Sequence, residues 1–167
     1  STNIPAFQQR FPDAKILYMV RDPLNVLPSG LSLVTGVLDK RFGFWSLEKE
    51  VRDRYLKRLY KALVELLQRF HEDWTNGSID KSKVLIIKYD SIMNDLEGLM
   101  DEIFTFTRFT PDADILEEIK KAADSQRQYT SAHIYDLKKF GLTAEQIRSD
   151  CSYIYDTFLN PQPNETD

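Results

Sequence analysis

The sequence has little cysteine and glycine and no long apolar run. Its only cysteine, Cys151, excludes an internal disulfide framework and is compatible with a reducing compartment. No stretch approaches the roughly 18 apolar residues that a transmembrane helix needs. The six glycines are scattered, and neither Gly-x-Gly-x-x-Gly nor Gly-x-x-x-x-Gly-Lys-Ser/Thr occurs, so no glycine-rich phosphate loop is expected.

An excess of basic residues is also missing. The chain has 22 Lys+Arg against 26 Asp+Glu, a net charge of −4, which argues against a general nucleic-acid-binding protein. A nucleotide stays possible because a few focused cations suffice to bind it. Two histidines without ligand spacing make a zinc site improbable, and His71 is expected to be a solvated residue near a helix end. We expect a cytoplasmic location, although the start at Ser-Thr-Asn suggests a processed product or a fragment and leaves a lost N-terminal anchor open.

Hydrophobic periodicity predicts alternating helices and strands. The length of 167 residues and the 42% hydrophobic content fit one globular domain. Helices are expected over residues 4–9, 24–38, 47–74, 95–106, 112–124 and 144–158, and strands over 15–20 and 84–87. The strands are nearly continuous apolar runs, as in parallel strands covered on both faces, so the predicted fold class is α/β with a parallel sheet flanked by helices. Two strands make a poor sheet, so we expect upstream sequence or a second chain to complete it.

Residues between and after these elements are expected to be irregular. An aromatic loop is predicted over 41–46, and Thr143 with Gln146 resembles a capping box for the last helix. The residues from 160 to 167 contain two prolines and no apolar run, so a disordered tail is expected.

The first candidate site contains Arg21 and Ser29, eight residues apart. Arg21 follows a predicted strand, and an Asp-Pro turn leads into a helix that carries Ser29. A guanidinium can bind phosphate through two parallel hydrogen bonds, and a helix N-terminus adds backbone donors. The alternative is that Arg21 pairs with a carboxylate and Ser29 faces solvent. The spacing by itself favours this alternative.

Two further segments carry candidate ligand groups. Tyr89 follows the second predicted strand, at the edge where open α/β sheets bind ligands, and it could contact a purine. The alternative, which the pattern by itself favours, is a tyrosine with a structural role. The polar segment 126–142 contains Ser131 and His133, whose hydroxyl and imidazole groups can satisfy phosphate oxygens. The alternative there is a surface loop packed by its tyrosines.

These segments resemble parts of sulfotransferases that use 3′-phosphoadenosine 5′-phosphosulfate (PAPS). Phe-Pro-Asp-Ala-Lys over 11–15, followed by Arg21-Asp-Pro and by Ser29, is similar to the family's 3′-phosphate-binding segment. Tyr89 matches a tyrosine that approaches the adenine. Tyr-x-Ser-x-His-x-Tyr-x-Leu over 129–137, followed by Phe-Gly-Leu, resembles the C-terminal part of a divergent branch, where a loop closes over the donor phosphates. Ala132 and Ile134 depart from it, because relatives often place basic residues there.

The resemblance implies a P-loop-kinase-like sulfotransferase fold that is incomplete at the N-terminus, with residues 1–159 forming the C-terminal portion of one domain. It implies transfer of a sulfuryl group from PAPS to a hydroxyl or amine of a small-molecule or carbohydrate acceptor, leaving PAP (adenosine 3′,5′-bisphosphate), and it requires no metal. The implied donor-binding residues are Arg21, Ser29, Tyr89, Ser131 and His133. The family's 5′-phosphosulfate loop and catalytic base have no counterpart in the 167 residues, so the chain by itself is expected to be inactive and no catalytic residue is assigned. A non-catalytic nucleotide-binding or structural subunit derived from a sulfotransferase is the alternative.

Overall fold

The computed structural model describes residues 3–128 and 136–160 and divides the chain into two compact units. Unit 1 contains residues 1–4, 22–78 and 134–167, and unit 2 contains residues 5–21 and 79–133. The predicted tail from 160 to 167 lies outside the described residues except for Asn160. Each unit is described by itself below.

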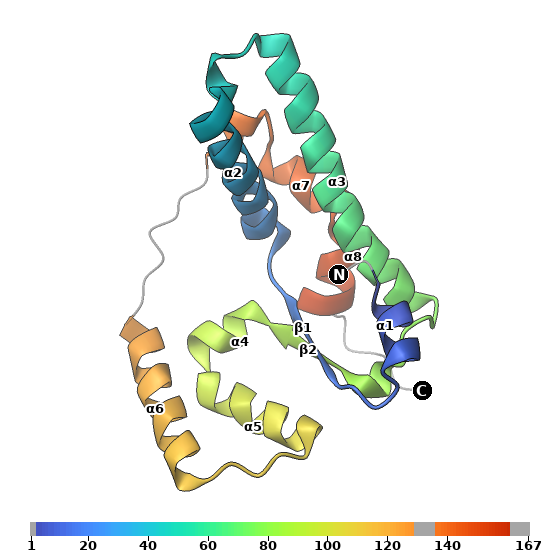
Figure 1. Cartoon of the computed structure of the whole chain (residues 1–167), viewed down its shortest axis with the longest axis vertical. Helices are drawn as coiled ribbons and strands as arrows, with labels where there is room; N and C mark the ends of the chain where they lie inside the picture. Colours follow the sequence, from blue (N-terminus) through green and yellow to red (C-terminus); the bar gives the residue numbers. More distant parts are fainter. Residues whose placement is uncertain (1–2, 129–135, 161–167) are drawn as a thin grey trace. The chain divides into compact units, whose positions relative to one another are not determined.

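Unit 2 contains the sheet (Figure 1). Its strands β1 (Ile16–Val20) and β2 (Val84–Lys88) are parallel, with a register that runs from Ile16 opposite Val84 to Val20 opposite Lys88. The predicted strands and their parallel pairing are therefore confirmed. The expected coverage of both faces is wrong for β1, because Leu17 and Met19 are about half exposed and alternate with less exposed neighbours.

Unit 2 also contains helices, which precede, separate and follow the two strands along the chain. They are α1 (Ile4–Arg10, nearly all in unit 2), the short 3₁₀ helix η2 (Lys81–Lys83), α4 (Tyr89–Asn94), α5 (Leu96–Thr107) and α6 (Ala113–Gln128). The helix α4 was not predicted, because its six residues are too few to show a helical period. Asp95 separates it from α5 by accepting a hydrogen bond from the backbone N–H of Gly98 at 3.0 Å.

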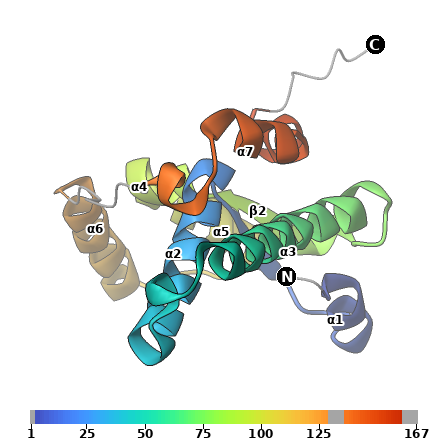
Figure 2. The ribbon, with the colours of Figure 1, turned by 90° about the horizontal axis from the view of Figure 1, so that it is seen from above.

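Unit 1 is built on a pair of long helices. Helix α2 (Pro23–Phe42) lies beside α3 (Lys49–Thr75), and the 3₁₀ helix η1 (Phe44–Ser46) connects them (Figure 2). Helix α2 extends four residues beyond the prediction because it ends only at Gly43, whose φ of 62° is the left-handed conformation that favours glycine. The predicted loop over 41–46 is therefore partly helical.

The C-terminal helices pack on this pair. They are η3 (Leu137–Phe140), α7 (Ala144–Asp150), α8 (Ser152–Ile154) and the π-helical turn η4 (Tyr155–Leu159). Thr143 caps α7 as predicted, with its hydroxyl oxygen accepting from the backbone N–H of Gln146 at 3.1 Å. The prediction of one continuous helix over 144–158 is wrong, because the backbone leaves the helical conformation at Cys151. The core of unit 1 contains Leu27, Leu31, Phe44, Leu56, Tyr60, Phe140, Leu142, Ile147 and Cys151.

Candidate functional site

Arg21 and Tyr89 are neighbours at the carboxyl ends of the two strands. Each directly follows its strand, and the pairing of Val20 with Lys88 places the two residues at adjacent positions. The guanidinium carbon of Arg21 lies over the ring of Tyr89, 4.0 Å from its centroid. This is a cation–π contact, and both side chains are half-buried. The carboxyl end of a parallel sheet is where open α/β folds bind ligands.

Within unit 2, Arg21 contacts an aromatic ring rather than a carboxylate. Within the described part of unit 2, no carboxylate forms an ion pair with Arg21. The alternative, in which a carboxylate pairs with Arg21 and neutralises it, is therefore not observed in the described part of unit 2. A guanidinium over an aromatic ring keeps its N–H groups in its own plane, where they can donate to an anion.

The N-terminus of α2 does not offer the free backbone donors that the strand-turn-helix pattern predicts. Asp22 caps the helix, its carboxylate accepting from the N–H of Leu24 at 2.8 Å. The carbonyl of Asp22 accepts from the N–H groups of Asn25 and Val26 at 2.8 and 3.0 Å, and Pro23 has no N–H to give. The first turn is thus satisfied by the chain itself, and an anion would be bound here by side chains.

Asp22 has a second partner that the sequence did not reveal. The Tyr155 hydroxyl donates to Asp22 Oδ1 at 2.5 Å, joining η4 to the start of α2 within unit 1. Burial, followed by this hydrogen bond, raises the pKa of Tyr155 well above its usual value. The two residues are 133 positions apart, so no local pattern could have predicted the contact.

The structure does not place the remaining predicted site residues relative to Arg21 and Tyr89. Ser29 is half-buried in the second turn of α2 and belongs to unit 1. Its approach to Arg21 stays a prediction that rests on the eight-residue spacing. Ser131 and His133 lie outside the described residues.

His71 was expected to be solvated, and this prediction is wrong. It is half-buried in α3, with its Nε2 atom 3.0 Å from the hydroxyl of Thr157 and its ring 5.0 Å from that of Tyr153. Burial lowers the pKa of His71, an effect that the neighbouring Glu72 opposes. The hydrogen bond and the ring contact give the imidazole a structural role in unit 1.

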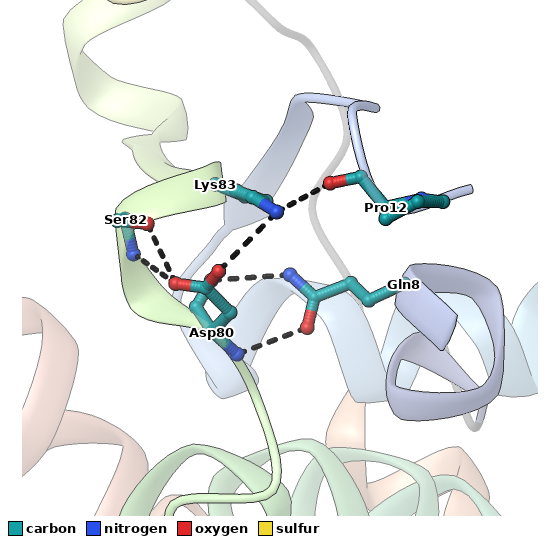
Figure 3. Close-up of polar contacts among 5 residues, drawn as sticks. All are labelled: Gln8, Pro12, Asp80, Ser82 and Lys83. Carbon is teal, nitrogen blue, oxygen red and sulfur yellow. Dashed lines mark hydrogen bonds and ion pairs between the residues drawn. The ribbon is translucent and has the colours of Figure 1, made fainter. Parts of the chain in front are cut away.

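A polar network fixes the opposite end of the sheet (Figure 3). Gln8 Nε2 donates to the Asp80 carbonyl at 3.1 Å, and the Asp80 N–H donates to Gln8 Oε1 at 3.0 Å. The Asp80 carboxylate accepts from the Ser82 hydroxyl at 2.6 Å and lies 3.6 Å from Lys83 Nζ, which also donates to the Pro12 carbonyl. These groups have partners within unit 2 and hold α1 and η2 at the amino ends of the strands.

Two general properties of the described residues bear on the site. No helix in residues 3–128 or 136–160 is both long and apolar enough to cross a membrane. In the same residues, no group of three or more His, Cys, Asp and Glu side chains is arranged to hold a metal ion.

Burial raises the pKa of the Cys151 thiol to about 11, so Cys151 is a protonated core residue rather than a nucleophile.

Comparison with known proteins gives one match. A family model described as the sulfotransferase family matches residues 1–114, which include both strands, Arg21, Ser29 and Tyr89. No curated protein and no solved structure matches the chain. The family match covers more than half of the 167 residues and ends within the first residues of α6. The chain belongs to the sulfotransferase family.

Proposed function

We propose that this chain forms the part of a sulfotransferase that binds the 3′-phosphate and adenine of PAPS, for transfer of a sulfuryl group to a hydroxyl or amine acceptor. The observation that supports this most is the contact between Arg21 and Tyr89 at the carboxyl ends of the strands. It combines a cation for a phosphate with an aromatic group for a purine at the ligand-binding edge of a parallel sheet.

Each proposed residue has a distinct part in donor binding. Arg21 binds the 3′-phosphate through its N–H groups, and the Ser29 hydroxyl donates to the same phosphate. Because the guanidinium covers one face of the Tyr89 ring, the adenine would contact the ring edge, the hydroxyl or the other face. Ser131 and His133 contribute further donors to the donor phosphates.

The reaction itself is an in-line transfer. The acceptor oxygen or nitrogen forms a bond to sulfur while the bond from sulfur to the 5′-phosphate oxygen breaks, and PAP leaves with that electron pair. A base takes the acceptor proton, and none of the five residues above is assigned this step. Their contribution is positioning of the donor, so we expect no turnover by the 167 residues alone.

The larger architecture is part of the same proposal. We infer a P-loop-kinase-like sulfotransferase fold in which residues 1–159 form the C-terminal portion of a single domain. The family match supports the inference, as does the parallel pairing of the two described strands, because most sheets of globular proteins have about four to six strands.

One observation favours the second candidate, a non-catalytic nucleotide-binding or structural subunit. Asp22 occupies the first turn of α2 and places a carboxylate next to Arg21 in the sequence. A carboxylate and a filled helix N-terminus both weaken anion binding at this point. A folded chain without affinity for the nucleotide would favour this candidate.

A thermal-shift titration with PAP tests the proposal. A specific site saturated to 100 times its dissociation constant stabilises the fold by about 2.7 kcal/mol. We expect Arg21→Ala to lose this stabilisation and Arg10→Ala to keep it. Arg10 is a matched control because it also lies over an aromatic ring, that of Phe11, in the same unit. Adenosine 5′-phosphate, which lacks the 3′-phosphate, should give a smaller shift. Equal shifts for both variants would contradict the proposal.

A further inference from the structure

Helices α5 and α6 form an antiparallel hairpin (Figure 1). Side chains of the two helices line an apolar groove. The two helices run in opposite directions, because Arg127 near the end of α6 forms an ion pair of 3.4 Å with Glu97 at the start of α5. The groove has a volume of about 470 Å³. Its floor and walls are Leu96, Met100, Ile115, Ile119 and Ala122, and its edge carries Asp114 and Glu118. These residues define the α5–α6 groove, which lies entirely in unit 2.

The net negative charge of the chain is concentrated in the segment that contains the hairpin. Residues 95–128 contain nine acidic and four basic residues, a net charge of −5, whereas the whole chain has −4. At the groove edge Asp114 is exposed, and Glu118 forms an exposed ion pair with Lys121 at 2.9 Å. A second hollow, which shares Met100 and Ile119 with the groove, is lined by Glu97, Asp101 and one lysine, Lys120. Carboxylates therefore outnumber lysines among the residues that line the two hollows.

The groove is separate from the part that defines the family. The sulfotransferase match ends at residue 114, whereas α6 runs from Ala113 to Gln128. One wall of the groove thus lies beyond the matched residues. The proposed donor-binding pair Arg21 and Tyr89 is not among the groove residues, so the groove does not belong to that site.

We propose that the α5–α6 groove binds a basic amphipathic helix of a partner protein. A groove between two helices accepts the ridge of side chains along a third, and apolar anchors at helical spacing would cover Met100 and Ile119. Lysines or arginines beside those anchors would face Asp114 and Glu118, and the charge of the hairpin would attract them from a distance. The lining residues span positions 96–100 of α5 and 114–122 of α6, so about two turns of partner, roughly 12 Å, match the groove.

Fluorescence anisotropy with a designed peptide on the full chain tests this inference. The probe is a labelled helix of about 18 residues, with leucines at i, i+4 and i+7 and lysines beside them. We expect saturable binding that weakens as salt rises from about 50 to 300 mM, because exposed charges are screened. A peptide with glutamate in place of lysine and a scrambled peptide of the same composition should bind at least about tenfold more weakly.

A matched pair of variants locates the binding. Ala122→Arg places a long cation in the groove, and Ala62→Arg makes the same change at an exposed position of α3. Both alanines are exposed, so both variants should keep the wild-type helical circular dichroism. We expect Ala122→Arg to weaken peptide binding about tenfold or more and Ala62→Arg to leave it unchanged. Asp114→Asn should reduce the affinity less, chiefly at low salt.

Several results would overturn the inference. Equal binding of the lysine and scrambled peptides would show attraction without a shaped site. Unchanged affinity in Ala122→Arg would place the peptide elsewhere. Failure of the folded wild-type chain to bind would show that the groove does not accept a basic helix. Self-association that Ala122→Arg abolishes in sedimentation velocity would show that a second copy of the chain covers the groove. None of these results depends on PAP, so they leave the proposed function untouched.

Discussion

The two ends of the small sheet differ in how their polar groups are satisfied. At the amino ends of the strands, Gln8 and Asp80 exchange two hydrogen bonds, and the Asp80 carboxylate is held by Ser82 and Lys83. At the carboxyl ends, Arg21 lies over an aromatic ring and has no carboxylate partner within the described part of unit 2. A closed polar network stabilises the fold, whereas a cation against a ring is ready for an anionic ligand. The difference separates a structural end of the sheet from a proposed binding end.

The largest expected effect is on nucleotide affinity. Arg21→Ala should weaken binding of PAP by about 10- to 100-fold, since a hydrogen bond to a charged group contributes about 1.5–3 kcal/mol. Gln8→Ala, at the other end of the sheet, should leave that affinity unchanged. Isothermal titration calorimetry on both variants measures the contrast. If Gln8→Ala weakened binding as much as Arg21→Ala, the two ends would not be functionally distinct.

Stability should respond in the opposite way. Gln8→Ala removes both hydrogen bonds to the backbone of Asp80, and we expect a loss of about 1 kcal/mol in the free energy of unfolding. Arg21→Ala should cost less, because a cation–π contact at a partly exposed site contributes about 0.5–1 kcal/mol. Urea denaturation of both variants tests the order. A larger loss in Arg21→Ala would make the carboxyl end the more important one for the fold.

Tyr89 sharpens the comparison at the binding end. Tyr89→Phe keeps the ring beneath Arg21, whereas Tyr89→Leu removes it. We expect Tyr89→Leu to weaken PAP binding by roughly two- to fivefold, because the guanidinium loses the cation–π contact that positions it, which contributes about 0.5–1 kcal/mol. The effect of Tyr89→Phe reports only the hydroxyl. Equal losses in the two variants would show that the hydroxyl, and not the ring, contacts the ligand.

The smallest expected effect is a pH dependence at the structural end. Hydrogen bonds from Ser82 and the charge of Lys83 lower the pKa of Asp80 below its usual value of 3.8. Its contribution to stability is therefore present above that value and is lost as the pH falls through the lowered pKa. We expect Asp80→Asn to flatten the acid limb of a plot of melting temperature against pH. Arg21→Ala should leave the shape of that limb unchanged, since arginine does not titrate there.

Local signals in the sequence predicted most of the secondary structure. Both strands follow from apolar runs, and the cap at Thr143 follows from an interaction between residues three positions apart. The missed features are those that local patterns do not encode. The break at Cys151 interrupts a continuous helical pattern, and the short helix at Tyr89 begins where a strand ends.

The candidate site was predictable only in part. The residue types and the spacing from Arg21 to Ser29 were visible in the sequence, and the resemblance attached roles to them. The filled N-terminus of α2 was not foreseen, although the Asp-Pro pair that fills it is a local signal for a capped helix start. The partner of Asp22, Tyr155, could not be predicted because it lies 133 residues away.

The sequence by itself determined the helices, the strands, the family resemblance and the chemistry of the candidate residues, because these depend on neighbours within a few positions. Only the tertiary structure decided that Tyr89 lies under Arg21 and that Gln8 secures Asp80. Those contacts join segments about 70 residues apart through the register of two parallel strands. That register is set by the packing of whole elements, which local periodicity does not specify.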